Sequence, residues 1–361
     1  MPEYVFEVIG DGAVENRPIT NHLKNALAVS NQRKGFANDT QKGACTMQQA
    51  KVQVEPLRWV TTGSGMQRRR RLRISFLFMT PAFLIIAIFM LGPALWAVYI
   101  SLTNMSLTGA GAETPQWVGI QNFLQILHDG EFWNAFRISL TYLVFSALIG
   151  QAVLGLLLAL LMQKRNPVFK SVLGAIVVCA WVIPDVVAGF LWSAFLAGGP
   201  QSVLAPGLLN SIMSTFGLPQ HAWLQQYPMT MIIVANIWRG TAFSMLLYAS
   251  ALEGVPSDIM EAASIDGAGI WSRLRYITLP LIKGAVATDL LLITLATLSD
   301  FTLVYVLTGN GNIHTELLTI YQYRQAFQFY QIGYGSAIAL LIIVVGAILS
   351  LLYINVLRID I

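Results

Sequence analysis

Six mainly apolar stretches divide the chain after about residue 70, and polar or charged segments separate them. Each stretch is close to the ~20 residues that an α-helix needs to cross the hydrocarbon core of a bilayer. The pattern therefore predicts an all-α, polytopic membrane protein with six transmembrane helices. The predicted spans lie at about 74–101, 138–162, 171–197, 229–252, 282–307 and 333–357.

Residues 1–65 differ from the rest of the chain, because they are polar, carry mixed charge and show neither a helical nor an alternating apolar period. This composition predicts a disordered cytoplasmic tail. It is also consistent with a mis-assigned start, since Met66 directly precedes the basic run QRRRRLR. The first residues lack the apolar core of a signal peptide, so no cleaved secretory segment is predicted. Residues 66–361 are expected to form one six-helix membrane domain.

The basic residues gather on alternate sides of the predicted spans. Cytoplasmic loops of membrane proteins are enriched in Lys and Arg, so the side with more basic residues is predicted to be cytoplasmic, and both termini with it. That side carries Arg68–Arg71, Arg73, Lys164, Arg165, Lys170, Arg273, Arg275, Lys283 and Arg358, whereas the other side carries only Arg137 and Arg324.

Composition agrees with this topology, because 55% of the residues are hydrophobic and 11% are charged, against roughly 25% charged in soluble domains. The net charge of +4 comes from basic residues beside apolar runs, so nucleic-acid binding is not predicted. Cys45 and Cys179 lie far apart, and the histidines show no ligand spacing. No metal or other cofactor is therefore predicted.

The sequence carries no motif for catalysis or for nucleotide binding. It contains no GxxxxGK[ST] phosphate loop, no HExxH and no GxSxG. We therefore expect no catalytic residues and no enzymatic activity. If transport uses ATP, a separate subunit must hydrolyse it.

The charged segment LEGVPSDIMEAASIDGAGIWSRLRYITLP separates the fourth and fifth apolar stretches. Ser257 is suited to cap a short helix that runs to about Asp266. Gly267 follows at the place where a left-handed conformation often ends a helix. Residues 270–279 are predicted to form a second helical piece before Pro280. The segment therefore predicts a helical hairpin on the cytoplasmic side.

Small residues next to a charge indicate a contact face on this hairpin. Ala262 and Ala263 beside Glu261 allow another protein to approach closely, and Ile259 lies four residues before Ala263 on the same side. A solvated loop that merely follows the charge bias of membrane proteins is equally compatible with these residues. The residue chemistry alone leaves both interpretations open.

The spacing of this segment resembles the EAA motif of permease subunits of binding-protein-dependent ABC importers. Three further stretches resemble first-permease, MalF-like subunits of the carbohydrate-uptake branch: FLFMTPAFLIIAIFMLGPALWAVYISLTN, WVGIQNFLQILHDGEFWNAFRISLTY and YRQAFQFYQIGYGSAIA. The resemblance covers about residues 66–361, and residues 1–65 have no counterpart in it. The residues that match the motif are Glu261, Ala262, Ala263, Gly267, Ile277, Leu279 and Pro280.

This resemblance implies the type I importer permease fold, and it implies that the 257–280 hairpin couples the subunit to an ATPase. Glu261 would be a polar anchor, Ala262 and Ala263 would allow close approach, and Gly267 would form the turn. Asp266, Ile277, Leu279 and Pro280 would belong to the same coupling element.

The resemblance also implies the surroundings of the subunit. Its expected partners are a second, homologous permease subunit in a heterodimer, two ATPase subunits, an extracytoplasmic solute-binding protein and the lipid bilayer. Its expected location is the cytoplasmic (inner) membrane of a bacterium or archaeon. The expected substrate is a sugar or a related polyol derivative.

Charged residues inside membrane spans are costly, and they mark candidates for a substrate path. Asp185 and Asp300 favour a polar cavity, Asp185 because Pro184 before it interrupts the helix. Arg239 is a further candidate, although it could equally pair with a carboxylate of a neighbouring span. Asp289 lies within two turns of the cytoplasmic end and is expected to reach water.

Neutral polar residues of the later spans suit sugar hydroxyls, although Ser and Thr also serve helix packing. The aromatic residues Trp238, Phe243 and Tyr248 are expected to face lipid or other helices. The neutral groups are Asn236, Thr294, Thr297, Ser299 and Tyr305. The selected candidates for the substrate path are Asp185, Asn236, Arg239, Thr297, Asp300 and Tyr305.

Two other functions remain compatible with these intramembrane carboxylates. A proton-coupled secondary transporter would carry its proton on Asp185 or Asp300. A membrane-embedded enzyme would use the same groups, but no paired catalytic motif accompanies them.

Overall fold

The computed structural model describes residues 4–9, 13–18, 78–163, 165–200, 205–309 and 314–357. The chain divides into two compact units, Met1–Ser75 and Phe76–Ile361. The first unit contains a two-stranded antiparallel sheet, and the second contains the helices.

Strands β1 (Tyr4–Ile9) and β2 (Ala13–Pro18) pair with Tyr4 opposite Pro18 and Ile9 opposite Ala13. No regular structure was predicted here, so the prediction of a disordered tail differs from the structure in these two segments. Apart from Glu7, the residues of β1 are aromatic or β-branched, and such residues favour strands. The remainder of residues 1–65 lies outside the described residues.

Helices long and apolar enough to cross a membrane make up most of the second unit. Four are continuous, and two further candidates are helix pairs bent at a short break, which gives up to six spans as predicted. The continuous spans are Phe78–Ser101, Gly130–Met162, Pro228–Glu253 and Ile332–Val356. Their labelled parts are η1 (Ala87–Leu91), α3 (Gly92–Ser101), α6 (Gly130–Tyr142), η2 (Leu143–Gln151), α7 (Ala152–Met162), α12 (Pro228–Glu253) and α19 (Ile332–Val356).

One bent pair makes up the third predicted span, and the other bends at Ile282, the first residue of the fifth. Helices α8 (Pro167–Val182) and α9 (Asp185–Phe195) meet at 102°. Pro184 lies at that break, so the predicted interruption is confirmed. In the other pair, the helical segment Ile270–Leu281 meets α16 (Lys283–Leu298) at 75°. That segment consists of α14 (Ile270–Arg273), η3 (Leu274–Thr278) and α15 (Leu279–Leu281).

The fifth predicted span, 282–307, was expected to be one helix, but the structure breaks it between α16 and α17. Helix α16 ends at Leu298, and α17 (Thr302–Thr308) begins three residues beyond Ser299. Helix α17 packs against α9, the second half of the other broken span. Irregular backbone at membrane depth is tolerated where it is buried in protein or lines a cavity. The break between α8 and α9 and the break between α16 and α17 therefore position a polar site inside the bundle.

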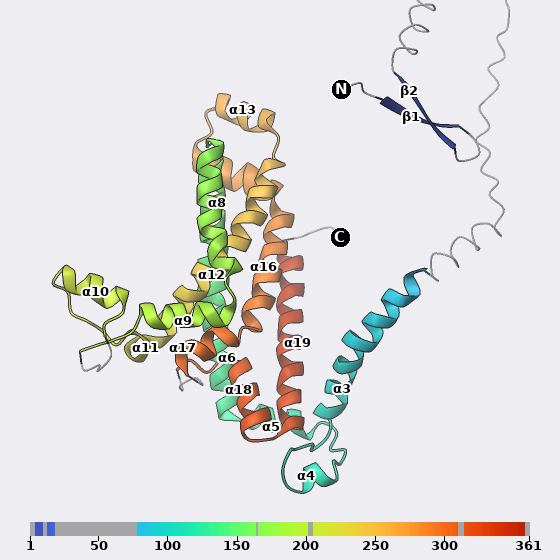
Figure 1. The fold of residues 1–361 in the computed structure, drawn as a ribbon, viewed down its shortest axis with the longest axis vertical. Helices are drawn as coiled ribbons and strands as arrows, with labels where there is room; N and C mark the ends of the chain where they lie inside the picture. The colour runs from blue at the N-terminus through green and yellow to red at the C-terminus, as the bar shows by residue number, and fades with distance from the viewer. Residues whose placement is uncertain are drawn as a thin grey trace, which may run out of the picture. The chain divides into compact units, whose positions relative to one another are not determined.

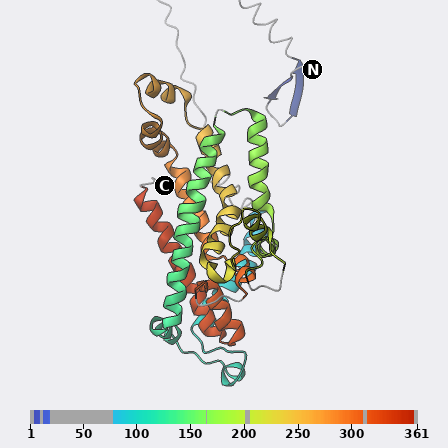
Figure 2. The ribbon, with the colours of Figure 1, turned by 90° about the vertical axis from the view of Figure 1, so that its left-hand side faces the viewer.

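Short helices lie at the two ends of the bundle (Figure 1). Helix α13 (Ser257–Ile265) lies at one end, and α5 (Gln121–His128) and α18 (Leu318–Tyr323) lie at the opposite end. The turned view in Figure 2 shows the same separation, with α13 and the start of α8 at a common end. The remaining short elements are α4 (Ala110–Glu113), α10 (Leu208–Thr215), α11 (Trp223–Gln226) and η4 (Arg324–Gln328).

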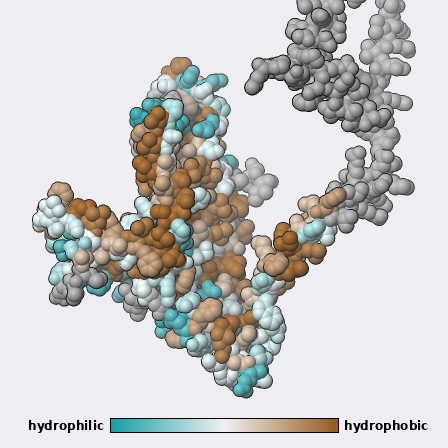
Figure 3. Space-filling model, in the orientation of Figure 1, coloured by the Kyte–Doolittle hydropathy of each residue, from teal (hydrophilic) through white to brown (hydrophobic). Residues whose placement is uncertain are grey.

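The outer surface of the bundle is mainly apolar between its two ends. Figure 3 shows mostly hydrophobic residues along the helices and hydrophilic residues gathered toward the ends, as a bilayer requires. Inside, Gly155 of α7 lies against α12, where a Cβ would come within 2.5 Å of the Ser244 Cβ. Small residues of this kind allow close packing of membrane helices.

Asp129 forms the centre of a polar clasp at the end that carries α5 and α18. Its Oδ1 accepts hydrogen bonds from the backbone N–H groups of Glu131 (2.9 Å) and Phe132 (3.4 Å), which caps α6. Its Oδ2 accepts hydrogen bonds from the hydroxyls of Tyr321 and Tyr334, the latter at 2.7 Å. The clasp therefore ties the start of α6 to α18 and α19.

Asp129→Ala should lower the thermal stability of the protein, because four hydrogen bonds to one carboxylate are lost. Burial raises the pKa of Asp129, but these hydrogen bonds outweigh it and hold the pKa below 3.8. The stabilisation is therefore present above pH 3.8 and is lost as the pH falls through the folded-state pKa. We expect a loss of about 1.5–3 kcal/mol near neutral pH and convergence with the wild type in acid, measured by thermal unfolding in detergent. The exposed Glu113→Ala is the control, and an equal effect of both changes would contradict the clasp.

Candidate functional site

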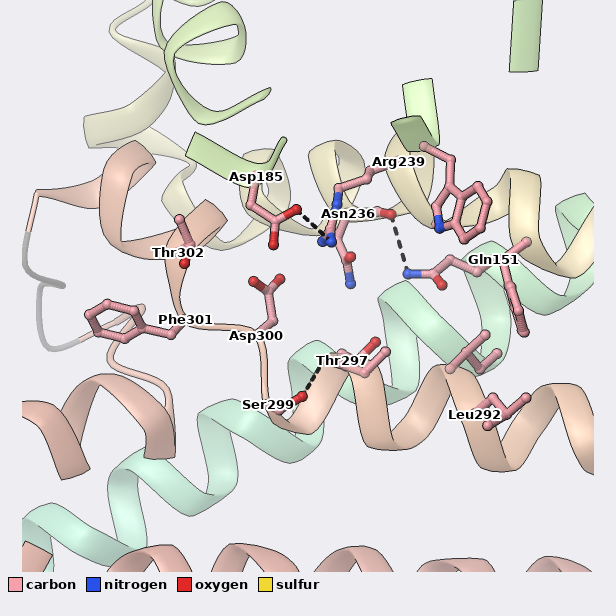
Figure 4. A pocket seen from close by; sticks show the side chains of 15 residues that line it. Gln151, Asp185, Asn236, Arg239, Leu292, Thr297, Ser299, Asp300, Phe301 and Thr302 are labelled. Carbon is pink, nitrogen blue, oxygen red and sulfur yellow. Dashed lines mark hydrogen bonds and ion pairs between the residues drawn. The ribbon is translucent and has the colours of Figure 1, made fainter. Parts of the chain in front are cut away.

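A cavity of about 460 Å³ with polar lining residues lies where the α8–α9 break and the α16–α17 break meet α12. Its walls come from η2, α8, α9, α12, α16 and the segment between α16 and α17 (Figure 4). The polar side chains that line it are Gln151, Asp185, Asn236, Arg239, Thr297, Ser299, Asp300 and Thr302.

Asp185 and Arg239 form an ion pair across the cavity. Arg239 Nη2 lies 2.6 Å from Asp185 Oδ1, and the two side chains are 25% and 37% exposed. Asp185 begins α9 directly after the break, where the helix dipole favours a negative charge. The expectation that Arg239 pairs with a carboxylate of a neighbouring span is confirmed, and the pair also lines the cavity.

Asp300 lies in the break between α16 and α17 and faces the same space (Figure 4). The hydroxyl of Tyr142 donates a hydrogen bond to its Oδ2 at 2.7 Å. Its backbone carbonyl accepts a hydrogen bond from the hydroxyl of Thr319 at 2.8 Å. Only 6% of the residue is exposed, and Oδ1 has no hydrogen-bond partner among the described residues.

Two amide side chains, one on η2 and one on α12, form a neutral part of the wall. Gln151 Nε2 donates to the carbonyl of Asn236 at 3.2 Å, and Asn236 Nδ2 donates to the hydroxyl of Ser146 at 2.9 Å. Gly240 lies beside Gln151, and a Cβ on it would come within 2.2 Å of the Gln151 Oε1. The position of the Gln151 amide therefore depends on a glycine at position 240.

Gly240→Ala should displace the Gln151 amide and reduce transport without removing the protein from the membrane. The amide is the end of a flexible side chain, so it can move aside and the fold can persist. We expect about a tenfold loss of uptake, which corresponds to the loss of one hydrogen bond of about 1–1.5 kcal/mol. Gly284→Ala is the matched control, since a Cβ there meets nothing within 4 Å. Equal uptake by the two variants would contradict this role of Gly240.

Aromatic rings form another part of the cavity wall. Trp181 and Phe243 both line it, with ring centroids 6.2 Å apart. Phe243 was predicted to face lipid or another helix, and it packs against Trp181 of α8 and a cluster of η2 and α16, but it also lines the cavity. The other predictions of this kind agree with the structure: Trp238 packs edge-on against Trp192 at 5.9 Å, and Tyr248 is buried in a helix-packing cluster.

The structure gathers most of the predicted path residues into this cavity. Asp185, Asn236, Arg239, Thr297 and Asp300 line it together.

Three other predicted polar residues lie elsewhere. Tyr305 is not among the lining residues and instead stacks on Phe301 at 4.9 Å. Thr294 pairs with the Tyr353 hydroxyl at 3.0 Å, as in helix packing. Asp289 was expected to reach water, but it is 0% exposed, because α16 turns it inward. Gln151 and Trp181 also line the cavity and were not predicted, although Gln151 is a polar residue in an apolar stretch.

The hairpin between α12 and α16 is a second candidate site, placed at one end of the bundle. The backbone N–H groups of Gly267 and Ala268 bond the carbonyls of Ser264 (3.2 Å) and Ala263 (2.9 Å). Together with a φ of +78° at Gly267, these bonds form the Schellman ending of a helix. The predicted turn glycine is therefore confirmed.

The predicted cap of the hairpin helix is wrong. Pro256 occupies the cap position, and the Ser257 hydroxyl donates instead to Asp258 at 3.3 Å. A serine next to an aspartate has a local acceptor, so its hydroxyl need not cap the backbone.

The tip of the hairpin exposes its motif residues and several large apolar side chains. Glu261, Ala262, Asp266, Gly267 and Pro280 are exposed, whereas Ala263, Ile277 and Leu279 are half-buried. Leu279 packs against the cluster that contains Ile282 and Tyr248, which fixes the base of the hairpin. The exposed apolar side chains at the tip are Ile265 (87%), Ile270 (76%) and Trp271 (79%).

A bundle of apolar helices, with two broken spans around a charged cavity, is the architecture of a membrane transport protein. The sequence pattern of one family, described as binding-protein-dependent transport system inner membrane component, matches residues 151–358. The chain belongs to this family, the one that its hairpin motif resembles.

Relatives of known kind share most of the chain. The trehalose/maltose transport system permease protein MalF of Thermococcus litoralis is 31% identical over 295 residues, which cover 80% of this chain and 94% of the relative. The trehalose transport system permease protein SugA of Mycobacterium tuberculosis is 32% identical over 295 residues, which cover 81% and 91%. Both matches extend beyond the family pattern into the earlier spans.

A solved structure is similar in fold. A bacterial alginate ABC transporter, in complex with an alginate pentasaccharide-bound periplasmic protein, matches with a TM-score of 0.66. The match covers 80% of this chain and 95% of the other, at 21% sequence identity. This likeness shows the importer permease fold.

Proposed function

We propose that this chain is the membrane-spanning permease subunit of an ATP-driven importer that moves a sugar or a related polyol derivative into the cytoplasm. The observation that carries the proposal is the hairpin 257–280. This hairpin has the EAA-type spacing, a tight turn at Gly267 and exposed apolar side chains at its tip.

The hairpin has the properties of a docking element for an ATPase subunit. Ile265, Ile270 and Trp271 expose apolar surface that gains free energy when a partner covers it. Ala262 and Ala263 keep one face thin, and Glu261 offers an exposed carboxylate beside them. Nucleotide-driven movement of the partner would act through this contact on the two broken spans.

The cavity supports the substrate class. It combines amide, hydroxyl and carboxylate groups with the rings of Trp181 and Phe243, and such a wall can bond sugar hydroxyls and cover an apolar sugar face. The names of the relatives from Thermococcus litoralis and Mycobacterium tuberculosis, which refer to trehalose and maltose, agree with this class.

The proposed assembly contains a second, homologous permease, two ATPase subunits and an extracytoplasmic solute-binding protein. The relative with a solved structure was crystallised with a periplasmic protein bound. The hairpin and the start of α8, which belongs to the basic 163–170 stretch, lie at one end of the bundle. We assign this end to the cytoplasm, and both termini with it, in a bacterial or archaeal inner membrane.

Removal of the ATPase subunit tests the proposal in cells. We expect cells to lose uptake of the labelled ligand of the solute-binding protein when the ATPase subunit is deleted. Uptake should return when the ATPase subunit is supplied in trans. Uptake that persists at the wild-type rate in the deletion strain would contradict the proposal and would favour a secondary transporter.

A further inference from the structure

We infer that Asp289 is a positioning residue, which fixes the register of α16 against α12 so that the two helices flanking the hairpin 257–280 move as one body. This inference rests on the proposed function and names the contact that would transmit a movement of the hairpin into the bundle. It follows from the burial of Asp289 and from the side chains that surround it.

Asp289 is a fully buried acidic residue that does not belong to the cavity. It lies in α16, is 0% exposed and is not among the residues that line the cavity. Neither oxygen of its carboxylate has a well-aligned hydrogen bond within the described part of the chain. A carboxylate buried within a membrane span is costly, and residues of this kind are candidates for function.

Two hydroxyl side chains of α12 lie next to Asp289. Ser244 and Tyr248 are four residues apart, so they share one side of α12, and both are buried and interact electrostatically with the carboxylate. On its other side, Ser244 packs closely on Gly155 of α7, where a Cβ would come within 2.5 Å of the Ser244 Cβ. The carboxylate and the two hydroxyls therefore form a closed polar group where α12 meets α16.

This polar group fixes the place along α12 at which α16 can lie. The neighbouring contacts between the two helices are mainly apolar, in a cluster that includes Tyr248, Leu252, Ile282 and Val286. Apolar contacts are not directional, so they leave the register free. One turn closer to the hairpin, the same side of α12 carries Leu252. A slide by one turn would place the carboxylate against this apolar side chain and away from the hydroxyls, which is costly.

Both helices lead from the hairpin to the cavity. Helix α12 ends at Glu253 and α16 begins at Lys283, so they hold the hairpin from both sides. Farther along, α12 lines the cavity with Asn236 and Arg239, and α16 lines it with Thr297. With the register fixed, a displacement of the hairpin moves both walls together. With the register free, sliding between the helices absorbs that displacement.

Distances between spin labels on the two helices measure the register. The purified complex of this chain with its partner subunits, in nanodiscs, carries labels at Ser250→Cys on α12 and Thr288→Cys on α16, with Cys45 and Cys179 replaced by serine. Both labelled positions are exposed. We expect this distance to be the same without nucleotide and after trapping with ATP and vanadate. A second pair, Thr288→Cys with the exposed Val187→Cys of α9, should change its distance on trapping.

Asp289→Leu should release the register while the fold persists. Leucine has a similar volume and removes a buried carboxylate, so the melting temperature should equal or exceed that of the wild type. After trapping, the distance between the labels on α12 and α16 should shift by about 1.5–5 Å, which is a slide of one residue to one turn. The change in distance between α16 and α9 should become smaller.

Two further variants separate register from general packing. Asp289→Asn keeps an acceptor and a donor for the hydroxyls of Ser244 and Tyr248, so it should retain the wild-type distances. Thr294→Val is the matched control, because Thr294 is a buried polar residue of the same helix that pairs with the Tyr353 hydroxyl of α19 at 3.0 Å. This control should leave the distance between α12 and α16 unchanged.

The outcomes separate this inference from the proposed function. An unchanged distance between α12 and α16 in Asp289→Leu, or an equal shift in Thr294→Val, would overturn the inference and leave the importer assignment intact. A melting temperature of Asp289→Leu well below that of the wild type would assign Asp289 to stability and would also overturn the inference. If trapping changes neither distance in the wild type, nucleotide does not act on this chain, and the proposed function fails together with the inference.

Discussion

Gly267→Val should abolish uptake while the protein still reaches the membrane at the wild-type level. Gly267 has a φ of +78°, and a Cβ there would meet nothing within 4 Å, so the effect of valine is conformational and not a clash. A β-branched residue in this region costs about 1–3 kcal/mol, which the short helix α13 cannot supply. We therefore expect the turn to open and the tip of the hairpin to lose its shape.

Gly269→Val is the matched control for this prediction. Gly269 lies two residues further along the hairpin, has a φ of −66° and also has open space around its Cβ position. Valine fits that conformation, so uptake should stay near the wild-type rate. The measurement is ATP-dependent uptake into vesicles, normalised to the amount of protein in the membrane. Normal uptake by Gly267→Val would contradict the coupling role of the hairpin.

Glu261→Lys tests the same contact through charge. Glu261 is exposed on α13 next to Ala262, so lysine should not unfold the helix. If Glu261 is the polar anchor of the hairpin, we expect loss of uptake and loss of the ATPase from the purified complex. Retention of both would remove Glu261 from the contact.

Arg239→Leu should have the largest effect in the cavity, because it leaves Asp185 without its bonded cation and removes the positive charge near Asp300. Breaking a fully buried pair costs 3–5 kcal/mol. This pair is 25% and 37% exposed, so solvent screening reduces the expected loss to about 1–3 kcal/mol. We expect a lower melting temperature in detergent and loss of uptake.

The double variant Asp185→Asn with Arg239→Leu separates charge from packing. If the unpaired carboxylates cause the damage, the second change should restore part of the melting temperature, as a double-mutant cycle measures. The exposed Arg137→Leu controls for the loss of a positive charge. A double variant that is as unstable as the sum of the single variants would show that Asp185 and Arg239 act independently.

Much of the fold was predictable from the sequence, because spans follow from apolar length and the first break follows from proline. Pro184 predicted the interruption before Asp185, and the structure bends there by 102°. The break at Ser299–Phe301 could not be predicted in the same way, since the segment contains neither proline nor glycine. That break depends on tertiary contacts, among them the Thr319 hydroxyl bonded to the Asp300 carbonyl.

The polar site was predictable in kind but only partly in membership. Charged residues in apolar stretches stand out, so Asp185, Arg239 and Asp300 were identified from sequence. Which face of a helix a neutral or aromatic residue occupies depends on how the helices pack, and the sequence alone does not fix that rotation. For this reason Tyr305 was predicted to line the cavity, and the cavity contact of Phe243 was not predicted.

In the proposed mechanism, nucleotide hydrolysis by a partner subunit acts through the hairpin and drives uptake by this chain. The most direct test reconstitutes the complete complex with its binding protein in liposomes and supplies either ATP or a proton gradient. We predict that the ligand of the binding protein is taken up when ATP is supplied on the side that carries the ATPase subunits, and that dissipating the proton gradient leaves the rate unchanged. Uptake that runs on the proton gradient without ATP would contradict the account and would assign the intramembrane carboxylates to proton transfer.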